Sequence, residues 1–579
     1  MASENGGRVL AGSASELQEQ GRLLTKLASL PVLVVWHEGR AYALEDRCPH
    51  MGFPLHRGSC EAGLLTCHWH HARFDLESGC TLDRWADDTR AFDVEVTGDD
   101  VWVSPRSTHD EVGHLQARLR EGLEDGLSLV IAKSVLGLLD AGVEPAALVR
   151  TGLEFGARNR AAGWGAGLTT LVAVANVLDH LTPSDRAVAL VHALSFLSND
   201  TRGQAPRFDV PPLATESLAA SRLAEWYRRF VGTRSPDAAE RVLSTALAEG
   251  MPLVEVEEML FAAVTDHVFV DGGHTLDFTN KAIESLAFVP ESRPLVLPSV
   301  VGQAATASRS EEGSEWRHPD DLAQLADDAG GRLPAALDSG RPRRGTFDDV
   351  AGLARQFLAE EPSTVVDALL HAVEAGATEE QIGQAVAYAA ALRVVHFHVQ
   401  NDFGDWDTVH HTFTAANALH QALRRAPTPE LLRGALHGAL RVYLDRFLNV
   451  PPARLPTAEH GSLEALGACF DVQGDVDVAG NEAFGYLRGG GTRTTLVAEL
   501  GRLLLREDVG FHTYQHFEAG VRQAWSWPED SDESRLILTG LTRFLAAHAP
   551  TRRELPTTIT IAARLRRGEH LFEDAVATT

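Results

Sequence analysis

The chain has 579 residues, of which 44% are hydrophobic, and a formal net charge of −28 from 52 basic and 80 acidic side chains. At roughly 100–200 residues per domain this length predicts three or four domains. The acidic balance disfavours nucleic acids and anionic membranes as partners. Five cysteines argue against a disulfide scaffold. No uncharged apolar run could span a bilayer, and residues 1–7 lack the basic start of a signal peptide, so we expect a cytoplasmic protein.

Short alternating strands dominate the beginning of the chain. Residues 32–36 and 41–44 read as a hairpin, and residues 92–96 and 101–103 read as a second hairpin around a Gly-Asp turn. The alternation stops at Pro105. We therefore predict a small all-β domain over residues 1–106.

Two short arms between these strands alternate cysteine with histidine. The first is Cys48-Pro49-His50, and the second is Cys67-His68-Trp69-His70. Two thiolates and two imidazoles suit a [2Fe–2S] cluster, with the cysteines on one iron and the histidines on the other. A structural zinc site is the alternative, but zinc fingers place both cysteines in one arm and both histidines in the other. The predicted cluster ligands are Cys48, His50, Cys67 and His70.

These arms resemble the Rieske family, and the run Phe74-Asp75-Leu76 followed by Gly79 belongs to the same pattern. His71 departs from it, because the family usually has glycine there. Respiratory Rieske proteins carry two extra loop cysteines, and the matching positions here look like Phe53 and Trp69. The resemblance therefore implies the ferredoxin and oxygenase type, a one-electron cofactor, and an electron-donating reductase or ferredoxin as partner.

The remainder, residues 107–579, shows helical periodicity and predicts a large all-α domain. Residues 114–141 read as one long amphipathic stretch. Glycine corners at Gly142, Gly250 and Gly376 each precede a new helix and suggest internal repeats of an antiparallel helical unit. The predicted sub-units are residues 107–289, 345–450 and 461–579, with a loop-rich segment at 290–344 whose residues 303–313 are expected to be the most mobile.

Histidines and carboxylates gather in three parts of the helical region, at residues 266–277, 396–411 and 512–518. His274 with Asp277, and Asp407 with His410, are each spaced i, i+3, so each pair lies on one helix face. Inward-facing histidines and carboxylates build metal sites in helical proteins. We predict that His274, Asp277, Asp407 and His410 are catalytic, and we expect any second metal, a non-heme iron, among a set of histidines: His267, His274, His396, His398 and His410. Capping histidines are the alternative interpretation.

The helical region also resembles the questin-oxidase-like family, through Gly273-His274-Thr275-Leu276-Asp277-Phe278 and through Asp405-Trp406-Asp407 followed by His410. That family consists of similar helical repeats linked to oxygen insertion next to an aromatic ketone. The sequence thus predicts a Rieske oxidoreductase whose cluster feeds electrons to a helical catalytic domain, an oxygenase for a small organic, aromatic substrate. The alternative is a redox sensor or electron-transfer protein in which the helices are only a binding scaffold.

Overall fold

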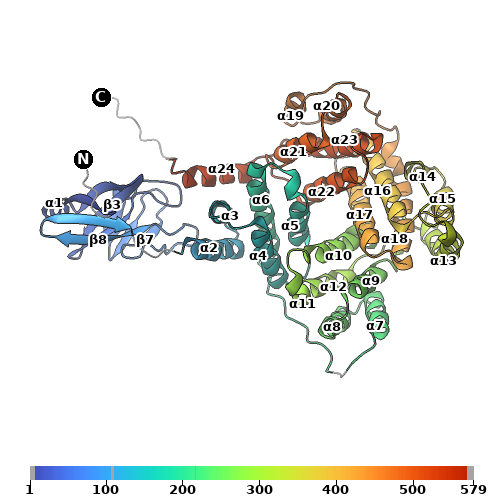
Figure 1. Cartoon of the computed structure of the whole chain (residues 1–579), viewed down its shortest axis with the longest axis horizontal. Helices are drawn as coiled ribbons and strands as arrows, with labels where there is room; N and C mark the ends of the chain where they lie inside the picture. The colour runs from blue at the N-terminus through green and yellow to red at the C-terminus, as the bar shows by residue number, and fades with distance from the viewer. Residues whose placement is uncertain (1–6, 106–109, 215–216, 570, 572–579) are drawn as a thin grey trace. The chain divides into compact units, whose positions relative to one another are not determined.

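The computed structural model describes residues 7–105, 110–214, 217–569 and 571, and it divides the chain into two compact units. Unit 1 comprises Met1–Glu144 and Glu554–Thr579, and unit 2 comprises Pro145–Arg553 (Figure 1). The boundary predicted at residue 106 and the segment 1–6 lie outside the described residues. An all-β domain followed by a large helical region is confirmed, although three helices beyond residue 106 belong to unit 1. None of the described helices is long and apolar enough to cross a bilayer.

The strands of unit 1 form two antiparallel sheets. One has six strands in the order β1-β9-β8-β4-β3-β2, and the other has the order β5-β6-β7. The strands are β1 (Val9–Ser13), β2 (Arg22–Leu27), β3 (Leu30–His37), β4 (Arg40–Glu45), β5 (Ser59–Glu61), β6 (Leu64–Thr66), β7 (Arg73–Asp75), β8 (Ala91–Thr97) and β9 (Asp100–Pro105).

Strand β3 supports the arms that carry the predicted cluster ligands. Its residues 32–35 are all buried, which places side chains of both strand faces inside the protein. The even-numbered pair packs in a core with β1, β9 and the short helix α1 (Ala14–Gln20). The odd-numbered pair packs in a second core that also contains Cys48 and Cys67. The predicted hairpin to β4 is confirmed, and its turn has Glu38 and Gly39 at positive φ, as a type I′ turn requires.

Three further helices complete unit 1: α2 (Glu111–Asp125), α3 (Ser128–Asp140) and α24 (Glu554–Arg566). The prediction of one continuous helical stretch over 114–141 is wrong. Gly126 adopts a φ of 71° and donates its backbone N–H to the carbonyl of Gly122, which ends α2. A left-handed glycine at a helix C-terminus is the usual reason for such a break.

All the regular secondary structure in the described residues of unit 2 is helical. Its helices of ten residues or more are α4 (Pro145–Arg158), α5 (Ala166–Val177), α6 (Pro183–Thr201), α7 (Ala220–Gly232), α8 (Pro236–Ala248), α9 (Leu253–Val264), α10 (His274–Ser285), α13 (Leu322–Gly340), α15 (Pro362–Glu374), α16 (Glu379–Val395), α17 (Asp405–Arg425), α18 (Pro429–Leu444), α20 (Val476–Arg488), α21 (Arg493–Leu504), α22 (Phe511–Trp525) and α23 (Asp532–Ala547). The shorter helices are α11 (Arg293–Val296), α12 (Val301–Thr306), α14 (Val350–Gln356) and α19 (Leu463–Cys469).

The structure corrects the prediction of a loop-rich segment over residues 290–344. That segment contains α11, α12 and the nineteen-residue α13. Helix α13 buries Leu322, Ala326, Ala329, Leu333 and Ala336 along one face, a spacing hidden in the sequence by surrounding Gly, Asp and Pro residues. Residues 303–313 are tied to the segment before α10 by backbone hydrogen bonds.

The glycine corners predicted from the sequence recur in the structure. Gly142, Gly250 and Gly376 all have positive φ, and each is followed within three residues by a helix. Gly490 is a fourth such corner, before α21. A capping box begins α16, with Gln381 N–H donating to Thr378 Oγ1 at 3.2 Å. After each corner helix the chain turns into one further helix, namely α5, α10, α17 and α22.

These four helices form the centre of unit 2, each packed against the next in a ring (Figure 1). Hydrogen bonds between side chains join α10 to α22 at successive levels along the helices. In two of these pairs, Asp277 with Gln515 and Glu284 with Arg522, the partners are 238 residues apart in the sequence. Three bonded pairs between α17 and α22, one in each of three layers, are 101 residues apart. A constant separation means that these helices run parallel and in register. Their N-terminal ends therefore meet at the same end of the bundle.

Candidate metal centres

The two arms of unit 1 are closed by matching backbone hydrogen bonds. Cys48 N–H donates to the carbonyl of Phe53 at 2.7 Å, and Cys67 N–H donates to the carbonyl of Ala72 at 2.8 Å. Each cysteine carbonyl in turn accepts a backbone N–H from four residues later, at 2.8 and 2.9 Å. The two cysteines are therefore presented by two similar turns.

The second of those N–H groups belongs to His71, which has a φ of 66°. The equivalent residue of the first arm is Gly52, with a φ of 80°. Both turns thus need a left-handed residue, which explains why glycine is usual at the position of His71. Histidine at position 71 keeps the turn, but a residue with a side chain pays a conformational cost in the left-handed region.

The four predicted ligands lie together. Cys48 and Cys67 are 2% and 1% exposed, and their thiols are hydrogen-bonded to each other. That bond raises the pKa of Cys48, together with burial, and lowers the pKa of Cys67 to about 6. The rings of His50 and His70 are 4.8 Å apart. Burial lowers the pKa of His50 to about 4, so the ring is neutral at physiological pH.

These residues fit an iron–sulfur cluster. The Nδ1 atom of His50 is buried and has no hydrogen-bond partner among the described residues, an arrangement that costs free energy unless the nitrogen binds something. Paired cysteines and paired neutral imidazoles are the donor set of a [2Fe–2S] centre with mixed ligands. Lys133 of α3 donates to the carbonyl of Pro49, inside the first arm.

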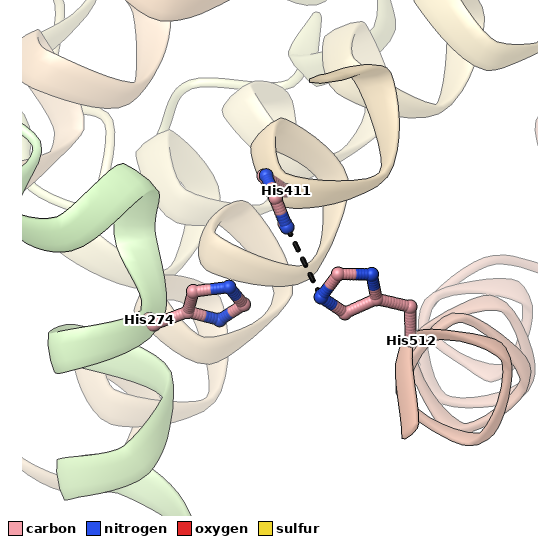
Figure 2. A group of neighbouring side chains, drawn as sticks. All are labelled: His274, His411 and His512. Atoms are coloured by element: carbon pink, nitrogen blue, oxygen red, sulfur yellow. Dashed lines mark hydrogen bonds between the residues drawn. The ribbon is translucent and has the colours of Figure 1, made fainter. Parts of the chain in front are cut away.

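In unit 2 a second group of histidines lies where the parallel helices begin. His274, His411 and His512 each offer one ring nitrogen, and these three atoms lie within 4.8 Å of one another. Figure 2 shows the three rings pointing toward one another from α10, α17 and α22. His411 Nε2 and His512 Nε2 are 3.2 Å apart. We call these residues the histidine trio.

An unusual backbone segment delivers His274. Phe269, Asp271, Gly272 and Gly273 all have positive φ, and His274 is the first residue of α10. Left-handed conformations at non-glycine residues cost free energy and occur preferentially at functional sites. Gln303 holds this segment by donating to Asp271 Oδ2 and to Thr275 Oγ1, both at 2.9 Å.

Asp407 orients another member of the trio. His512 Nδ1 is 3.2 Å from Asp407 Oδ1, while the other nitrogen of that ring faces His411. A carboxylate bonded to the outer nitrogen fixes the tautomer of a metal-binding histidine and leaves the inner nitrogen free to bind. The hydrogen bond to His512 also holds the pKa of Asp407 below its ordinary value.

The environment keeps His274 and His411 uncharged. Burial, with His512 as the next contribution, lowers the pKa of His274 to about 4, and burial and His274 lower that of His411 to about 3. Metal binding requires neutral imidazole, so both rings are ready to bind at neutral pH. All three side chains remain partly exposed, and Phe511 lies beside them with its ring centroid 5.5 Å from that of His274. The trio therefore has an accessible side with an aromatic neighbour.

His410 lies next to the trio but makes a different contact. Its Nδ1 is 3.2 Å from Nδ1 of His516, and both residues are fully buried. The Nε2 atoms of both rings have no hydrogen-bond partner among the described residues. The rings pack on Phe544, with His516 stacked at 3.8 Å.

Asp277 belongs to a charged layer one turn further along the bundle. It accepts a hydrogen bond from Gln515 and lies 3.7 Å from Lys281, whose ammonium also contacts Glu284 and Glu518 at 3.1 Å each. Burial, reinforced by Glu518 and Glu284, raises the pKa of Asp277 to about 6. The structure thus pairs Asp277 with Gln515 and Lys281.

Three of the histidines predicted for a second metal lie elsewhere. His267 Nδ1 is 2.6 Å from a carboxylate oxygen of Glu311, and His396 Nδ1 is 3.1 Å from the carbonyl of Ala453. His398 Nδ1 accepts the backbone N–H of Gln400 at 3.2 Å. These contacts match the alternative in which histidines bind carbonyls or nearby carboxylates.

Sequence reasoning did not single out His411 and His512, although both lie in the segments where histidines gather. A signal was available, because each of these histidines and His274 lies in the first two turns of the helix that follows a corner helix, namely α10, α17 or α22. The fourth glycine corner, at Gly490, is the feature that places residues 512–518 in the same series.

Residues 7–93 match the Rieske [2Fe-2S] domain family. Human apoptosis-inducing factor 3 is 36% identical over 73 residues, which is 12% of this chain and 12% of that protein. The 4beta-methylsterol monooxygenase of Methylococcus capsulatus is 46% identical over 43 residues, 7% of this chain and 12% of that enzyme.

Among solved structures, the ferredoxin of carbazole 1,9a-dioxygenase from Nocardioides aromaticivorans IC177 is 25% identical, with a TM-score of 0.16, and the match covers 17% of this chain and all of that one. This chain spans only about an eighth of the length of the first curated relatives that it matches. The arms, the buried thiols and the family match converge on one conclusion: residues 7–93 are a Rieske [2Fe–2S] domain.

Proposed function

We propose that this protein is an oxidoreductase in which the Rieske domain passes electrons to a metal held by His274, His411 and His512, where oxygen reacts with a small organic substrate. The observation that carries the proposal is the convergence of the trio, three imidazoles from three repeats, in a chain that also has a Rieske domain. An electron-donating reductase or ferredoxin is the partner that such a cluster requires.

The residues of the trio favour iron in a redox role. Imidazole suits iron, copper, nickel and zinc, and three protein ligands leave coordination positions open for small molecules. When bound, iron would supply the site for dioxygen. Around it, Asp407 holds the His512 ring, and Phe511 provides an aromatic surface for an apolar substrate. Zinc would fit the same nitrogens, but a zinc site gains nothing from an electron-transfer domain.

When bound, the [2Fe–2S] cluster accepts and donates one electron at a time. The chain's own contribution is to bury both thiols, which shields the cluster from water, while leaving His70 exposed at the surface. Electrons can therefore enter or leave on the histidine side. The relatives named above include a monooxygenase, which supports an oxygenase role.

The test is a metal count joined to a kinetic measurement. We expect iron beyond the two atoms of the cluster, and rapid reoxidation of the dithionite-reduced cluster by oxygen in the intact chain. In His411→Ala the additional iron and the rapid reoxidation should both be lost while the Rieske EPR spectrum is kept. A chain that holds only cluster iron, with reoxidation unchanged in His411→Ala, would instead support the sensor or electron-transfer alternative.

A further inference from the structure

A small apolar cavity of about 30 Å³ lies between α9, α10, α17 and α18. Its wall is formed largely by aliphatic and aromatic side chains, among them Val264, Phe269, Leu276 and Leu419. The described contacts of the trio do not use these side chains, so the cavity is separate from the set of metal-binding nitrogens.

The cavity borders the backbone that carries two members of the trio. Gly273 and Ala415 are both in its wall, the first directly before His274 and the second one turn after His411. A Cβ atom on Gly273 would lie 2.6 Å from the Cβ of Ala415, too close for any side chain. Glycine at this point is therefore needed both for the φ of 93° and for the close approach of α10 to α17.

The size and polarity of the cavity restrict what it can hold. A water molecule needs about 10–15 Å³ and two to four polar partners. The hydroxyl of Thr265 is one of the few polar groups of the wall, and it is already bonded to the carbonyls of Phe261 and Glu430 at 2.9 Å each. Organic ligands occupy pockets of roughly 300–1,000 Å³. A cavity of this volume and lining suits a diatomic apolar molecule.

The cavity has a neighbour on its Thr265 and His437 side. A larger polar pocket of about 540 Å³ lies beside it, and Thr265 and His437 belong to the walls of both. The charged groups of the outer pocket include Asp266, Glu311 and Arg433. Burial lowers the pKa of His437 to about 4, so the ring that separates the two spaces is neutral.

We propose that this cavity is a dioxygen site, filled from the outer pocket past Thr265 and His437, that supplies the metal position at His274, His411 and His512. The inference rests on the proposed function, since it names the path of one substrate of that reaction. Apolar molecules partition from water into dry apolar cavities, so the cavity concentrates oxygen beside the site of its reduction.

Xenon tests the cavity without any metal, because it occupies dry apolar cavities of this kind. We expect crystals of the full chain under xenon pressure to show xenon beside Ala416, a wall residue of α17. Ala416→Val should exclude it. Ala418→Val makes the same change at a buried position of the same helix that does not line the cavity, and it should keep xenon. Leu419→Phe is a second filling variant in case Ala416→Val folds poorly.

The oxygen role is tested on the metal-loaded protein. The two filling variants should raise the KM for oxygen several-fold at unchanged metal content and unchanged rate at saturating oxygen, whereas Ala418→Val should not. Absence of xenon, or an unaltered KM for oxygen in a variant that excludes xenon, would overturn the proposal while leaving metal binding by the trio intact. Failure of the wild-type trio to bind metal would instead overturn the proposed function, and the oxygen role with it.

Discussion

The Rieske domain and the histidine trio present metal ligands in opposite ways. In the Rieske domain all four predicted ligands lie within residues 48–70, on two turns fixed by backbone hydrogen bonds. In unit 2 the proposed ligands are residues 274, 411 and 512, and the register of three parallel helices brings them together. The first site is specified by local sequence, and the second exists only once the repeats have packed.

The difference extends to what holds each ligand. The cysteines of the Rieske domain depend on turns with left-handed residues, so local backbone geometry supports them. The trio depends on side-chain contacts between helices, such as that of Asp407 with His512, and on the strained segment before His274. Substitution of a predicted ligand in the Rieske domain should therefore abolish the cluster outright. Substitutions around the trio should instead lower its metal affinity by graded amounts.

The largest effect is expected for Cys67→Ser. The variant removes a buried thiol that belongs to both the ligand set and the core around β3, so the Rieske EPR signal of the reduced protein should be abolished. Because the trio lies in another compact unit, its metal should remain, as measured by iron per chain. An unchanged EPR signal would contradict the assignment of this ligand.

His411→Ala gives the reciprocal result. Loss of one of three nitrogens should weaken metal binding at the trio on the order of 100-fold or more, measured by titration of the metal-free protein, without altering the Rieske spectrum. The matched control is His420→Ala on the same helix, a buried histidine 3.1 Å from Gln523. The control should lower the melting temperature but keep metal affinity. Equal affinity losses in both variants would point to general unfolding.

How far the sequence alone reaches follows from the same contrast. The Rieske domain and both hairpins could be predicted because cysteine spacing and strand alternation act over a few residues. The helical class and the glycine corners could also be predicted, since each reflects local backbone preference. The choice of His411 over His410 could not, because the two are adjacent and only the packing of α17 decides which ring faces α22.

Asp407→Asn should have an intermediate effect. Asparagine keeps the size of the side chain but weakens its hold on the His512 ring, and such supporting carboxylates typically contribute 10–100-fold to metal affinity. Asp405→Asn is the control, since it removes a carboxylate from the same first turn of α17 and costs the same helix-dipole interaction. Similar metal affinity in the two variants would show that Asp407 acts only on the helix.

The smallest effect concerns stability in the charged layer around Lys281. Burial raises the pKa of Asp277 to about 6, above its value of about 3.9 in the unfolded chain. Between these values the folded protein binds the extra proton, so stability falls as pH rises from about 4 to 6 and stays lower above that. Asp277→Asn removes this cost and should therefore be more favourable, relative to wild type, at pH 8 than at pH 4.5, by about 1–3 kcal/mol in the free energy of unfolding.

Glu284→Gln in the same layer should behave in the opposite sense. Despite the cost of burial, Lys281, Arg522 and Arg425 hold the pKa of Glu284 well below its ordinary value, so its charge stabilises the fold at neutral pH. Its removal should destabilise more at pH 8 than in acid. Urea unfolding at both pH values measures the free energy of unfolding of the two variants. Their metal content is determined separately. If Asp277→Asn followed the wild-type pH dependence, the raised pKa would be contradicted. If it kept its metal and fold but lost turnover, Asp277 would be catalytic, as the sequence predicts, because a carboxylate that acts only on stability leaves the reaction unchanged.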